Sequence, residues 1–341
     1  MRIQYTKDGG YTISATYTDD ITNASSSNEA ESQTFSKIEH EFKVIDHGRP
    51  IVILGMGSIL HDNGDISIHQ KALIVKALAD HGMTDCNPKY TPLPPSIDLF
   101  NSQPSPIPEE DKFFMLNKPY HKVCRIFNHI ANGTHPDIAF SIMLLMRYAT
   151  DPHPIHWHLI LHLLAYLKAT MNLGITYRSG GTLKPTRYSD SSYADELQSR
   201  KLSAGYVFLS AGSAVGWKAK MQQRVSTSTR EAEYIGVFKA GKQAKWMTLW
   251  YTELDQFYDL PITVYCNNEA AVILAKNTNG HSKIKHVSMK PHWIREIIEA
   301  KEVIVKGILT EENIADIFTK ALHHPKHEKF VKMMGIEVLN I

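Results

Sequence analysis

The sequence predicts a mixed α/β protein that is built from more than one unit. From residue 181 onward, three consecutive strand patterns are followed by alternating helix and strand patterns, which is the order of a mixed sheet with flanking helices. Residues 113–180 show helical spacing, and a Pro-rich stretch at 88–112 separates them from an N-terminal region that is rich in strand patterns. We therefore predict four segments, 1–87, 88–112, 113–180 and 181–341.

The composition is ordinary for a globular protein and gives no global signal for nucleic-acid binding. Of the 341 residues, 43% are apolar and 21% are charged, and the formal net charge is only +2. Local basic clusters must therefore support any nucleic-acid hypothesis. The 18 histidines are scattered and show no zinc-binding spacing, so surface and core-edge positions are expected for them.

The cysteines and the apolar segments predict the compartment. Cys86, Cys124 and Cys266 are odd in number and far apart, which favours a reducing, intracellular environment, either cytoplasm or nucleus. The first ten residues contain no apolar core of a signal peptide, so secretion is not expected. The most apolar stretch, 139–146, is too short to span a bilayer, and no membrane location is expected.

The N-terminal patterns are those of a strand hairpin, a polar helix, a second hairpin and a further helix. In order, we predict strands within 11–21, a helix at 29–42, an apolar strand run at 51–60, a turn at Asp62-Asn63-Gly64-Asp65 and a helix at 70–81. The adjacent carboxylates of Asp19 and Asp20 interrupt the first strand pattern, and burying them would be costly. They stand either in a plain acidic turn or at a hairpin tip that faces a metal ion.

Helical patterns dominate the middle of the chain, and strand patterns return after Gly180-Gly181. Helices are expected from 119 to about 131, at 136–148 and at 156–171, the last with Ile160, Leu161, Leu163, Leu164 and Leu167 on its buried side. The C-terminal region is predicted to contain strands at 185–190, 204–209, 214–218, 262–266 and 303–308, and helices at 229–255, 268–276, 284–300, 313–320 and 325–334.

Acidic residues at two of these elements indicate a candidate catalytic site. Asp190 ends the first C-terminal strand, and Glu231 and Glu233 lie in the first turns of the long helix that begins near Thr229. An acid at the end of a strand and another at the start of the following helix can face one cleft. With a third and a fourth acid supplied later in the chain, such a cleft could hold two metal ions and cut phosphodiesters.

A series of motifs, in the same order along the chain, resembles the C-terminal part of the Pol polyprotein of copia-type LTR retrotransposons, where the end of the reverse transcriptase precedes the RNase H domain. The motifs are Tyr17-Thr18-Asp19-Asp20, Gly82-Met83-Thr84-Asp85-Cys86 with Thr91-Pro92-Leu93-Pro94, Ala131-Asn132-Gly133-Thr134-His135-Pro136-Asp137-Ile138-Ala139, Tyr188-Ser189-Asp190, Ser203-Ala204-Gly205-Tyr206-Val207, Trp217-Lys218, Glu231-Ala232-Glu233-Tyr234, His281-Ser282-Lys283-Ile284-Lys285-His286 and Ala315-Asp316-Ile317-Phe318-Thr319-Lys320. Each motif alone is weakly specific, but together they cover nearly the whole chain.

The resemblance implies an RNase H-like mixed five-stranded sheet with flanking helices at 181–341, preceded by a truncated reverse-transcriptase palm at 1–87 and a helical connection region at 113–180. It also implies four acids that bind Mg²⁺ or Mn²⁺ and an RNA–DNA hybrid as the partner, next to other parts of a Pol polyprotein. Asp190 would bridge both metals, Glu233 (preferred over Glu231) would be the second acid, and Asp316 would be the fourth. The third acid belongs in a Cys-Asp-Asn motif, which here reads Cys266-Asn267-Asn268.

Two departures from the family pattern bear on activity. Asn267 offers a neutral amide oxygen where Mg²⁺ prefers a carboxylate, and loss of one electrostatic partner costs about 10²–10³ in rate. Glu269 would face elsewhere in a helix that follows Asn267. Asp19 and Asp20 are expected to be a polymerase remnant, because the sequence begins only sixteen residues before Tyr17 and lacks the further acid and the fingers that a polymerase requires.

Basic clusters predict that nucleic-acid binding is retained even if catalytic activity is lost. Lys218, Lys220 and Arg224 form one cluster, and Lys283 and Lys285 belong to another; both would contact phosphates without reading sequence. An ordinary solvated surface explains the same charges equally well. Two functions therefore stay open at this point. One is a two-metal endonuclease that cuts the RNA strand of hybrids, and the other is a catalytically inactive remnant or nucleic-acid-binding module.

Overall fold

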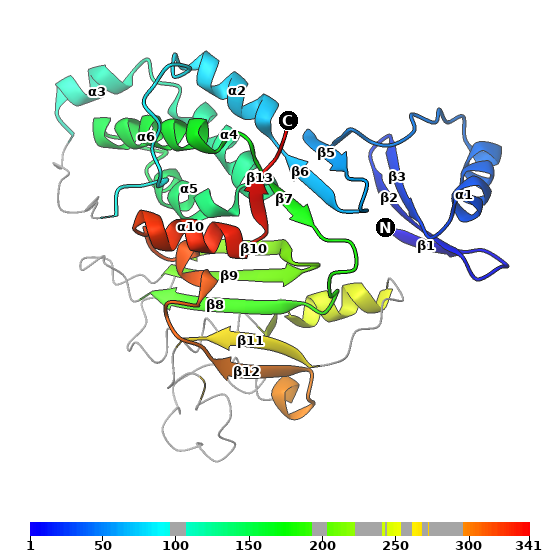
Figure 1. Ribbon diagram of the computed structural model, residues 1–341. Coiled ribbons are helices and arrows are strands. Elements are labelled where there is room, and N and C mark those ends of the chain that lie inside the picture. The colour runs from blue at the N-terminus through cyan, green and yellow to red at the C-terminus, as the bar shows by residue number, and fades with distance from the viewer. Residues whose placement is uncertain are drawn as a thin grey trace.

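A computed structural model of the chain describes residues 1–95, 107–192, 203–221, 241–242, 244–253, 261–267, 272 and 296–341. The described part contains three sheets, with the strand orders β1-β2-β3, β13-β7-β6-β5-β4 and β10-β9-β8-β11-β12. Figure 1 shows the three-stranded sheet with α1 at one side of the molecule, away from the sheet of β8 to β12. No helix in these ranges is long and apolar enough to cross a membrane.

The N-terminal unit is an antiparallel three-stranded sheet with one helix. Its elements are β1 (Arg2–Tyr5), β2 (Tyr11–Tyr17), β3 (Asp20–Ser25) and α1 (Asn28–Glu41). Ser27 caps α1 by accepting a hydrogen bond from the backbone N–H of Ala30, which satisfies one of the free donors at the helix start. Tyr17 pairs with Asp20, so Asp19 and Asp20 lie at the turn of a hairpin.

The second sheet joins segments that are far apart in the sequence. It consists of β4 (Val52–Ile53), β5 (Met56–Leu60), β6 (Ile66–His69), β7 (Leu173–Tyr177) and β13 (Ile336–Val338). The apolar run at 51–60 is not one strand, because Leu54 and Gly55 have φ values of 52° and 76° and turn the chain. β7 and β13 are too short to give a strand pattern, and their antiparallel pairing brings the C-terminus beside the N-terminal half.

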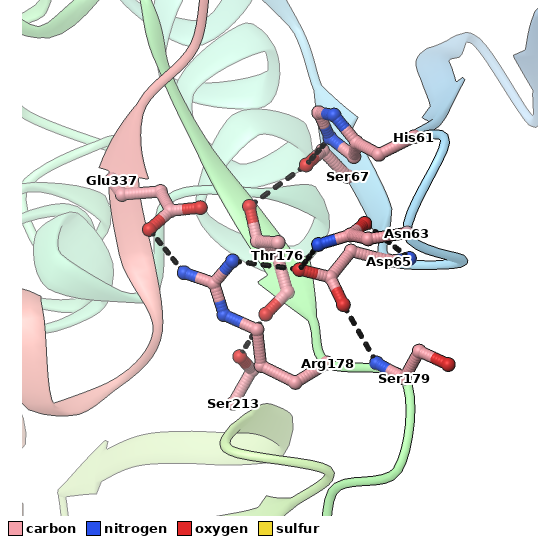
Figure 2. A network of polar contacts seen from close by, with 9 residues as sticks. All are labelled: His61, Asn63, Asp65, Ser67, Thr176, Arg178, Ser179, Ser213 and Glu337. Atoms are coloured by element: carbon pink, nitrogen blue, oxygen red, sulfur yellow. Dashed lines mark hydrogen bonds and ion pairs between the residues drawn. The ribbon is translucent and has the colours of Figure 1, made fainter.

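A polar network fixes this sheet at the end of β7 (Figure 2). Arg178 donates to Asp65 Oδ2 at 2.8 Å and to Glu337 Oε2 at 2.5 Å, so one guanidinium joins the β5–β6 hairpin to β13. Asp65 Oδ1 accepts from the backbone N–H of Ser179 at 2.8 Å, and Asn63 Nδ2 donates to Asp65 Oδ2 at 3.1 Å. Both carboxylate oxygens of Asp65 are therefore hydrogen-bonded.

A group of helices packs together and forms an apolar core. They are α2 (Lys71–Asp80), α3 (Glu109–Met115), α4 (Tyr120–Gly133), η1 (Pro136–Ile138, a 3₁₀ helix), α5 (Ala139–Met146) and α6 (Pro154–Thr170). Phe127, Ile130, Leu145 and Ile160 are fully buried among them. Of the five residues predicted on the buried side of α6, Leu161 alone is only partly buried. α3 begins inside the predicted Pro-rich segment, directly after its last proline, Pro108.

The third sheet confirms the predicted mixed five-stranded RNase H-like fold. Its strands are β8 (Thr186–Ser192), β9 (Ser203–Ser210), β10 (Ser213–Met221), β11 (Ile262–Cys266) and β12 (Val303–Gly307). β8, β9 and β10 pair antiparallel in a meander, whereas β11 runs parallel to both β8 and β12. Two apolar clusters, one around Val264 and one around Phe318, pack against the sheet, the latter with η2 (Ile314–Phe318) and α10 (His324–Met333).

Candidate functional site

Asp190 lies near the end of β8, the central strand of the third sheet, and its side chain is 5% exposed. The residue opposite it in β9 is Gly205. A Cβ at this position would come within 2.4 Å of the Phe318 Cβ, so glycine allows η2 to pack directly on the sheet beside Asp190. From this close position, the hydroxyl of Thr319 donates a hydrogen bond to Asp190 Oδ2. The C-terminal segment is thereby held at the carboxylate.

Asn267 directly follows the strand beside β8, as Asp190 follows the last residue of β8 that pairs with that strand. Cys266 at the end of β11 pairs in parallel with Ser189, and Asn267 follows directly, as Asp190 follows Ser189. Within the described ranges, the amide oxygen of Asn267 is buried without a hydrogen-bond partner. A buried oxygen in this condition is uncommon in folded proteins and indicates a place that a cation, a water molecule or another ligand would satisfy.

Asp316 lies in η2, fully buried, and its charge is compensated by two lysines. Lys320 Nζ is 2.9 Å and Lys326 Nζ is 2.8 Å from the same oxygen, Asp316 Oδ2. Both lysines are partly exposed, which lets their ammonium groups remain hydrated on one side. Asp316 Oδ1 is buried and has no hydrogen-bond partner in the described part of the chain. A buried carboxylate requires such pairing, because desolvation of the bare charge would be very costly.

Two polar side chains of the same segment join η2 to the central strand. Asn313 caps η2 by accepting from the backbone N–H of Ala315 at 3.2 Å, and its Nδ2 donates to the Ser189 carbonyl at 3.1 Å. The Thr319 hydroxyl, which donates to Asp190, also lies 3.1 Å from the Asp316 carbonyl. The Thr319 hydroxyl therefore lies between the Asp190 carboxylate and the Asp316 backbone carbonyl. Side chains before and after Asp316, those of Asn313 and Thr319, position η2.

The other face of β8 carries a buried cation. Arg187 is fully buried, and its guanidinium carbon lies 4.3 Å from the ring centre of Tyr206 and 4.5 Å from that of Phe208. Burial lowers the pKa of Arg187 to about 9, although the nearby Tyr206 opposes this shift. Because side chains alternate along a strand, Arg187 and Asp190 project to opposite faces, so the cation does not neutralise the candidate site directly.

Among the residues that the structure describes, this site is short of anionic oxygens for a metal centre. Across the described ranges, no group of three or more His, Cys, Asp or Glu side chains is placed to hold a metal ion. Asp190 is bonded to Thr319, the neighbouring position is a neutral amide, and both lysines contact Asp316. Mg²⁺ depends on carboxylate oxygens for charge compensation. The described residues therefore do not by themselves fit the two-metal centre that the sequence resemblance implies.

Several predicted residues lie elsewhere or outside the described ranges. Glu231 and Glu233, the two helix acids, lie outside the described residues, as do Arg224, Lys283 and Lys285 of the basic clusters and Glu269. Lys218 and Lys220 are exposed on β10, at the edge of the sheet. Asp19 and Asp20 are exposed at the β2–β3 turn, on the three-stranded sheet at the side of the molecule (Figure 1).

Sequence reasoning did not single out the residues that hold the acids in place. Asn313, Thr319, Lys320 and Lys326 all contact Asp316 or its neighbours, but only Asp316 itself was expected at the site. One signal was available, because Lys320 stands four residues after Asp316, a spacing at which side chains meet on a helical turn. The contact from Lys326 depends on the turn between η2 and α10, which no local pattern specifies.

Comparisons with known proteins connect these features to transposons. No family model matches the chain. The retrovirus-related Pol polyprotein from transposon TNT 1-94 of Nicotiana tabacum is 30% identical over 300 residues, which are 88% of this chain and 22% of that protein. The retrovirus-related Pol polyprotein from transposon RE2 of Arabidopsis thaliana is 26% identical over 322 residues, which are 94% of this chain and 21% of that protein. The chain thus spans about a fifth of the length of these relatives.

Two further matches cover only part of the chain. The secreted RxLR effector protein 161 of Plasmopara viticola is 34% identical over 135 residues, which are 40% of this chain and 95% of that protein. The crystal structure of LC11-RNase H1 in complex with RNA/DNA hybrid covers 40% of this chain and 94% of that chain, with a TM-score of 0.30 and 19% identity. The Pol polyproteins, which match along nearly the whole chain, confirm the resemblance that the motifs indicate.

Proposed function

The chain is related to the Pol polyproteins of copia-type retrotransposons, and on that premise we propose that its C-terminal half is an RNase H-type module that binds RNA–DNA hybrids but has lost most of its capacity to cut the RNA strand. The fold and the relatives place the chain among RNase H-type retrotransposon proteins. The proposal goes further, because it assigns a substrate and a catalytic state to this particular chain.

One observation supports the loss of activity above all others. The position beside Asp190 at the end of the parallel strand β11 is Asn267, whose amide oxygen is buried without a partner in the described ranges. Phosphodiester hydrolysis builds negative charge on the phosphate, and the enzyme must compensate it with metal ions held by carboxylates. A neutral amide at this place weakens the hold on the metal. The two ammonium groups on Asp316 weaken it further, because they already compensate that carboxylate.

Binding depends on different groups from catalysis. Lys218 and Lys220 are exposed on the edge strand of the same sheet and are available to phosphates. Contacts of this kind give affinity that falls with salt and does not depend on base sequence. Substitution of one metal-site acid leaves them intact, so a protein that has lost cleavage keeps its hybrid affinity.

The competing function is an active two-metal endonuclease in which Asp190, Glu233 and Asp316 hold Mg²⁺ or Mn²⁺. It would require Glu233 or Glu231 to complete the site and Asp316 to release its lysines. Other parts of a Pol polyprotein would then be its partners, as they would for the inactive module. An intracellular location stays a prediction under both functions.

A cleavage assay separates the two functions. The full-length chain is incubated with a hybrid whose RNA strand carries a 5′ label, in Mg²⁺ or in Mn²⁺. We expect cleavage close to background for the natural chain and a gain of about 10²–10³ for Asn267→Asp, because the new carboxylate restores the missing charge. The double variant Asn267→Asp/Asp190→Asn is the control that any restored cleavage comes from this site. Turnover by the natural chain equal to that of Asn267→Asp would contradict the proposal.

A further inference from the structure

Four buried ionisable side chains meet where the helices of residues 113–180 contact α10. His135 and Asp137 come from the N-cap and the body of η1, Tyr166 comes from α6, and His327 comes from α10. None of the four residues is more than 3% exposed. Ionisable side chains are seldom buried this completely unless their charges are balanced. The charge balance of this cluster therefore bears directly on how firmly α10 is held.

Asp137 is the single carboxylate of the cluster, and both of its oxygens already have partners. His135 Nδ1 lies 3.2 Å from Asp137 Oδ1, and the Tyr166 hydroxyl donates to Asp137 Oδ2. A proton on His135 is therefore balanced by an adjacent negative charge. Asp316 on the adjacent η2 offers no further compensation, because two lysines already pair with it.

The imidazole of His327 lies in surroundings that disfavour a second positive charge. Its ring stands at right angles to that of Tyr166, with the centroids 5.5 Å apart, and its Nε2 is buried without a hydrogen-bond partner among the described residues. The small cavity beside it is lined by Asp137, Ser141, Lys320 and otherwise apolar side chains, and the charge of Lys320 would repel another cation. Burial lowers the pKa of His327 below its ordinary value, although Asp137 opposes this shift.

The other ionisable groups on the elements around His327 supply no second anion in the described part of the chain. His324 of α10 and His162 of α6 are themselves bases, and a charge on His324 opposes one on His327. The one carboxylate on α10, that of Glu328, is exposed and lies 2.7 Å from Lys332. The remaining groups are cationic or neutral at pH 7, namely Lys89, Tyr90, Lys320, His323, Lys326 and Lys329.

The same helix carries a group that acts at the candidate site. α10 lies between α5 and the strands of the third sheet (Figure 1), and Phe330 packs its apolar side into the cluster around Phe318. Lys326, directly before His327, lies 2.8 Å from Asp316 Oδ2. Release of α10 would therefore remove one of the two cations that compensate Asp316.

From this arrangement we infer that His327 is the centre of a pH-sensitive switch, in which α10 stays docked while the imidazole is neutral and is released when a second proton enters the cluster. One carboxylate balances one imidazolium, and a second buried cation without a partner is strongly destabilising. Because burial lowers the folded-state pKa of His327, docking is strongest above the unfolded value of about 6.5 and weakens as the pH falls towards the folded-state value. The switch does not depend on hybrid binding.

The test is amide hydrogen–deuterium exchange of the full-length chain, followed by mass spectrometry on peptides of α10 at pH 7.5 and at pH 5.5, with correction for the intrinsic pH dependence of exchange. The opening equilibrium of α10 should be about tenfold larger at pH 5.5, because opening takes up one proton over one pH unit below 6.5. His327→Gln cannot be protonated and should open equally at both pH values. His324→Gln, at an exposed position of the same helix, is the matched control and should keep the natural dependence.

Three outcomes would overturn the inference. The first is equal opening of α10 at the two pH values in the natural chain. The second is a pH dependence that persists in His327→Gln, which would assign it to another group. The third is opening of α2 and α6 in parallel with α10, which would show global acid destabilisation rather than local release.

If His327→Gln fails to fold, the natural chain still gives the answer. Exchange of the imidazole Cε1 hydrogens, followed by mass spectrometry between pH 4 and pH 9, reports the protonation of each histidine separately. The midpoint for His327 should lie below the ordinary value of about 6.5. A midpoint at or above that value in the folded chain would contradict the switch.

Discussion

Two polar centres of this protein differ in how completely their oxygens are satisfied. In the second sheet, Asp65 receives hydrogen bonds on both carboxylate oxygens from Arg178, Asn63 and the Ser179 backbone (Figure 2). In the RNase H-like sheet, Asn267 and Asp316 each keep one buried oxygen without a partner among the described residues. Both centres join segments far apart in the sequence, so both contribute to holding the fold together.

The difference separates a structural centre from a site that derives from a catalytic one. A network selected for stability tends to satisfy every buried polar atom, because an unsatisfied atom costs about 1–3 kcal/mol. Active sites accept this cost because a ligand completes them. We interpret the unpaired oxygens at Asn267 and Asp316 as the remainder of such a site, in which a carboxylate has been replaced and two lysines have taken over part of the charge compensation.

The largest effect is expected from Asp190. In the Asn267→Asp background, Asp190→Asn should lower hybrid cleavage by about 10²–10³, because the central carboxylate is then neutral. The measurement is the initial rate on the 5′-labelled hybrid, with circular dichroism to verify folding. Asp65→Asn in the same background serves as the matched control and should leave the rate unchanged. A rate insensitive to Asp190 would place the restored chemistry somewhere else.

The lysines of Asp316 should have the next largest effect. Lys320→Met/Lys326→Met leaves a buried carboxylate without its cations and should lower the free energy of unfolding by about 3–5 kcal/mol. Adding Asp316→Asn removes the stranded charge, so the triple variant should recover most of this loss. Urea denaturation of the three proteins measures it. A triple variant that is as unstable as the double variant would show that the lysines act through packing rather than through charge.

Asp137 is another buried carboxylate with polar contacts, and it tests how much such contacts contribute to the stability of the fold. Asp137 is fully buried near the junction of η1 and α10, where Tyr166 donates to its Oδ2 and His135 Nδ1 lies 3.2 Å from its Oδ1. Desolvation alone would raise the pKa of Asp137, but His135, His327 and Tyr166 together hold it below its ordinary value.

Tyr166→Phe removes one of these donors and should lower the free energy of unfolding by about 1.5–3 kcal/mol, because a hydrogen bond to a buried charge is lost. Urea denaturation at pH 7 measures this change, and Tyr148→Phe, at a stacked tyrosine on α5's C-terminal side, is the comparison. A Tyr166→Phe protein as stable as the natural chain would mean that water replaces the lost hydroxyl.

The smallest effect is a pH dependence at Asp65. The hydrogen bond from Arg178, followed by that from the Ser179 backbone, lowers the pKa of Asp65 below its ordinary value. Because the folded-state pKa is lowered, the stabilisation is fully present above the unfolded pKa of about 4 and is lost as the pH falls through the folded pKa.

Asp65→Asn should therefore have a lower Tm than the natural chain at pH 7. The difference in Tm between the two proteins should shrink as the pH falls below about 4. Scanning calorimetry across this range measures the difference, and Asp62→Asn, at an exposed acid in the same turn, is the control. A Tm difference between Asp65→Asn and the natural chain that stays constant down to pH 2 would contradict the assigned role of Asp65.

The parts of the fold that were predictable are those with strong local signals. The five strands of the RNase H-like sheet have apolar or alternating patterns, and Asp62-Asn63-Gly64-Asp65 contains the residues typical of a hairpin turn. β7 and β13 were missed, because three to five residues carry too little pattern and their pairing depends on contacts across more than 150 residues of chain. The turn at Leu54 was missed because a left-handed leucine has no sequence signature.

The site was predictable where motifs exist and obscure where contacts are long-range. Asp190 and Asn267 follow from their strands, and the structure pairs the residues directly before them, Ser189 and Cys266. The contact of Lys326 with Asp316 and the hydrogen bond from Thr319 to Asp190 depend on the tertiary packing of η2 against Gly205, which no local sequence pattern specifies. Glu231 and Glu233 lie outside the described residues, so their roles stay predictions.

Metal binding tests the central claim most directly, because it measures the charge deficit at Asn267 without relying on turnover. Isothermal titration of Mn²⁺ into the full-length chain and into Asn267→Asp, each with Asp190→Asn as a control, reports both affinity and stoichiometry. We predict weak or undetectable binding by the natural chain and a gain of Asp190-dependent binding on restoring the carboxylate. Two Asp190-dependent sites in the natural chain, filled as tightly as in the variant, would contradict the account.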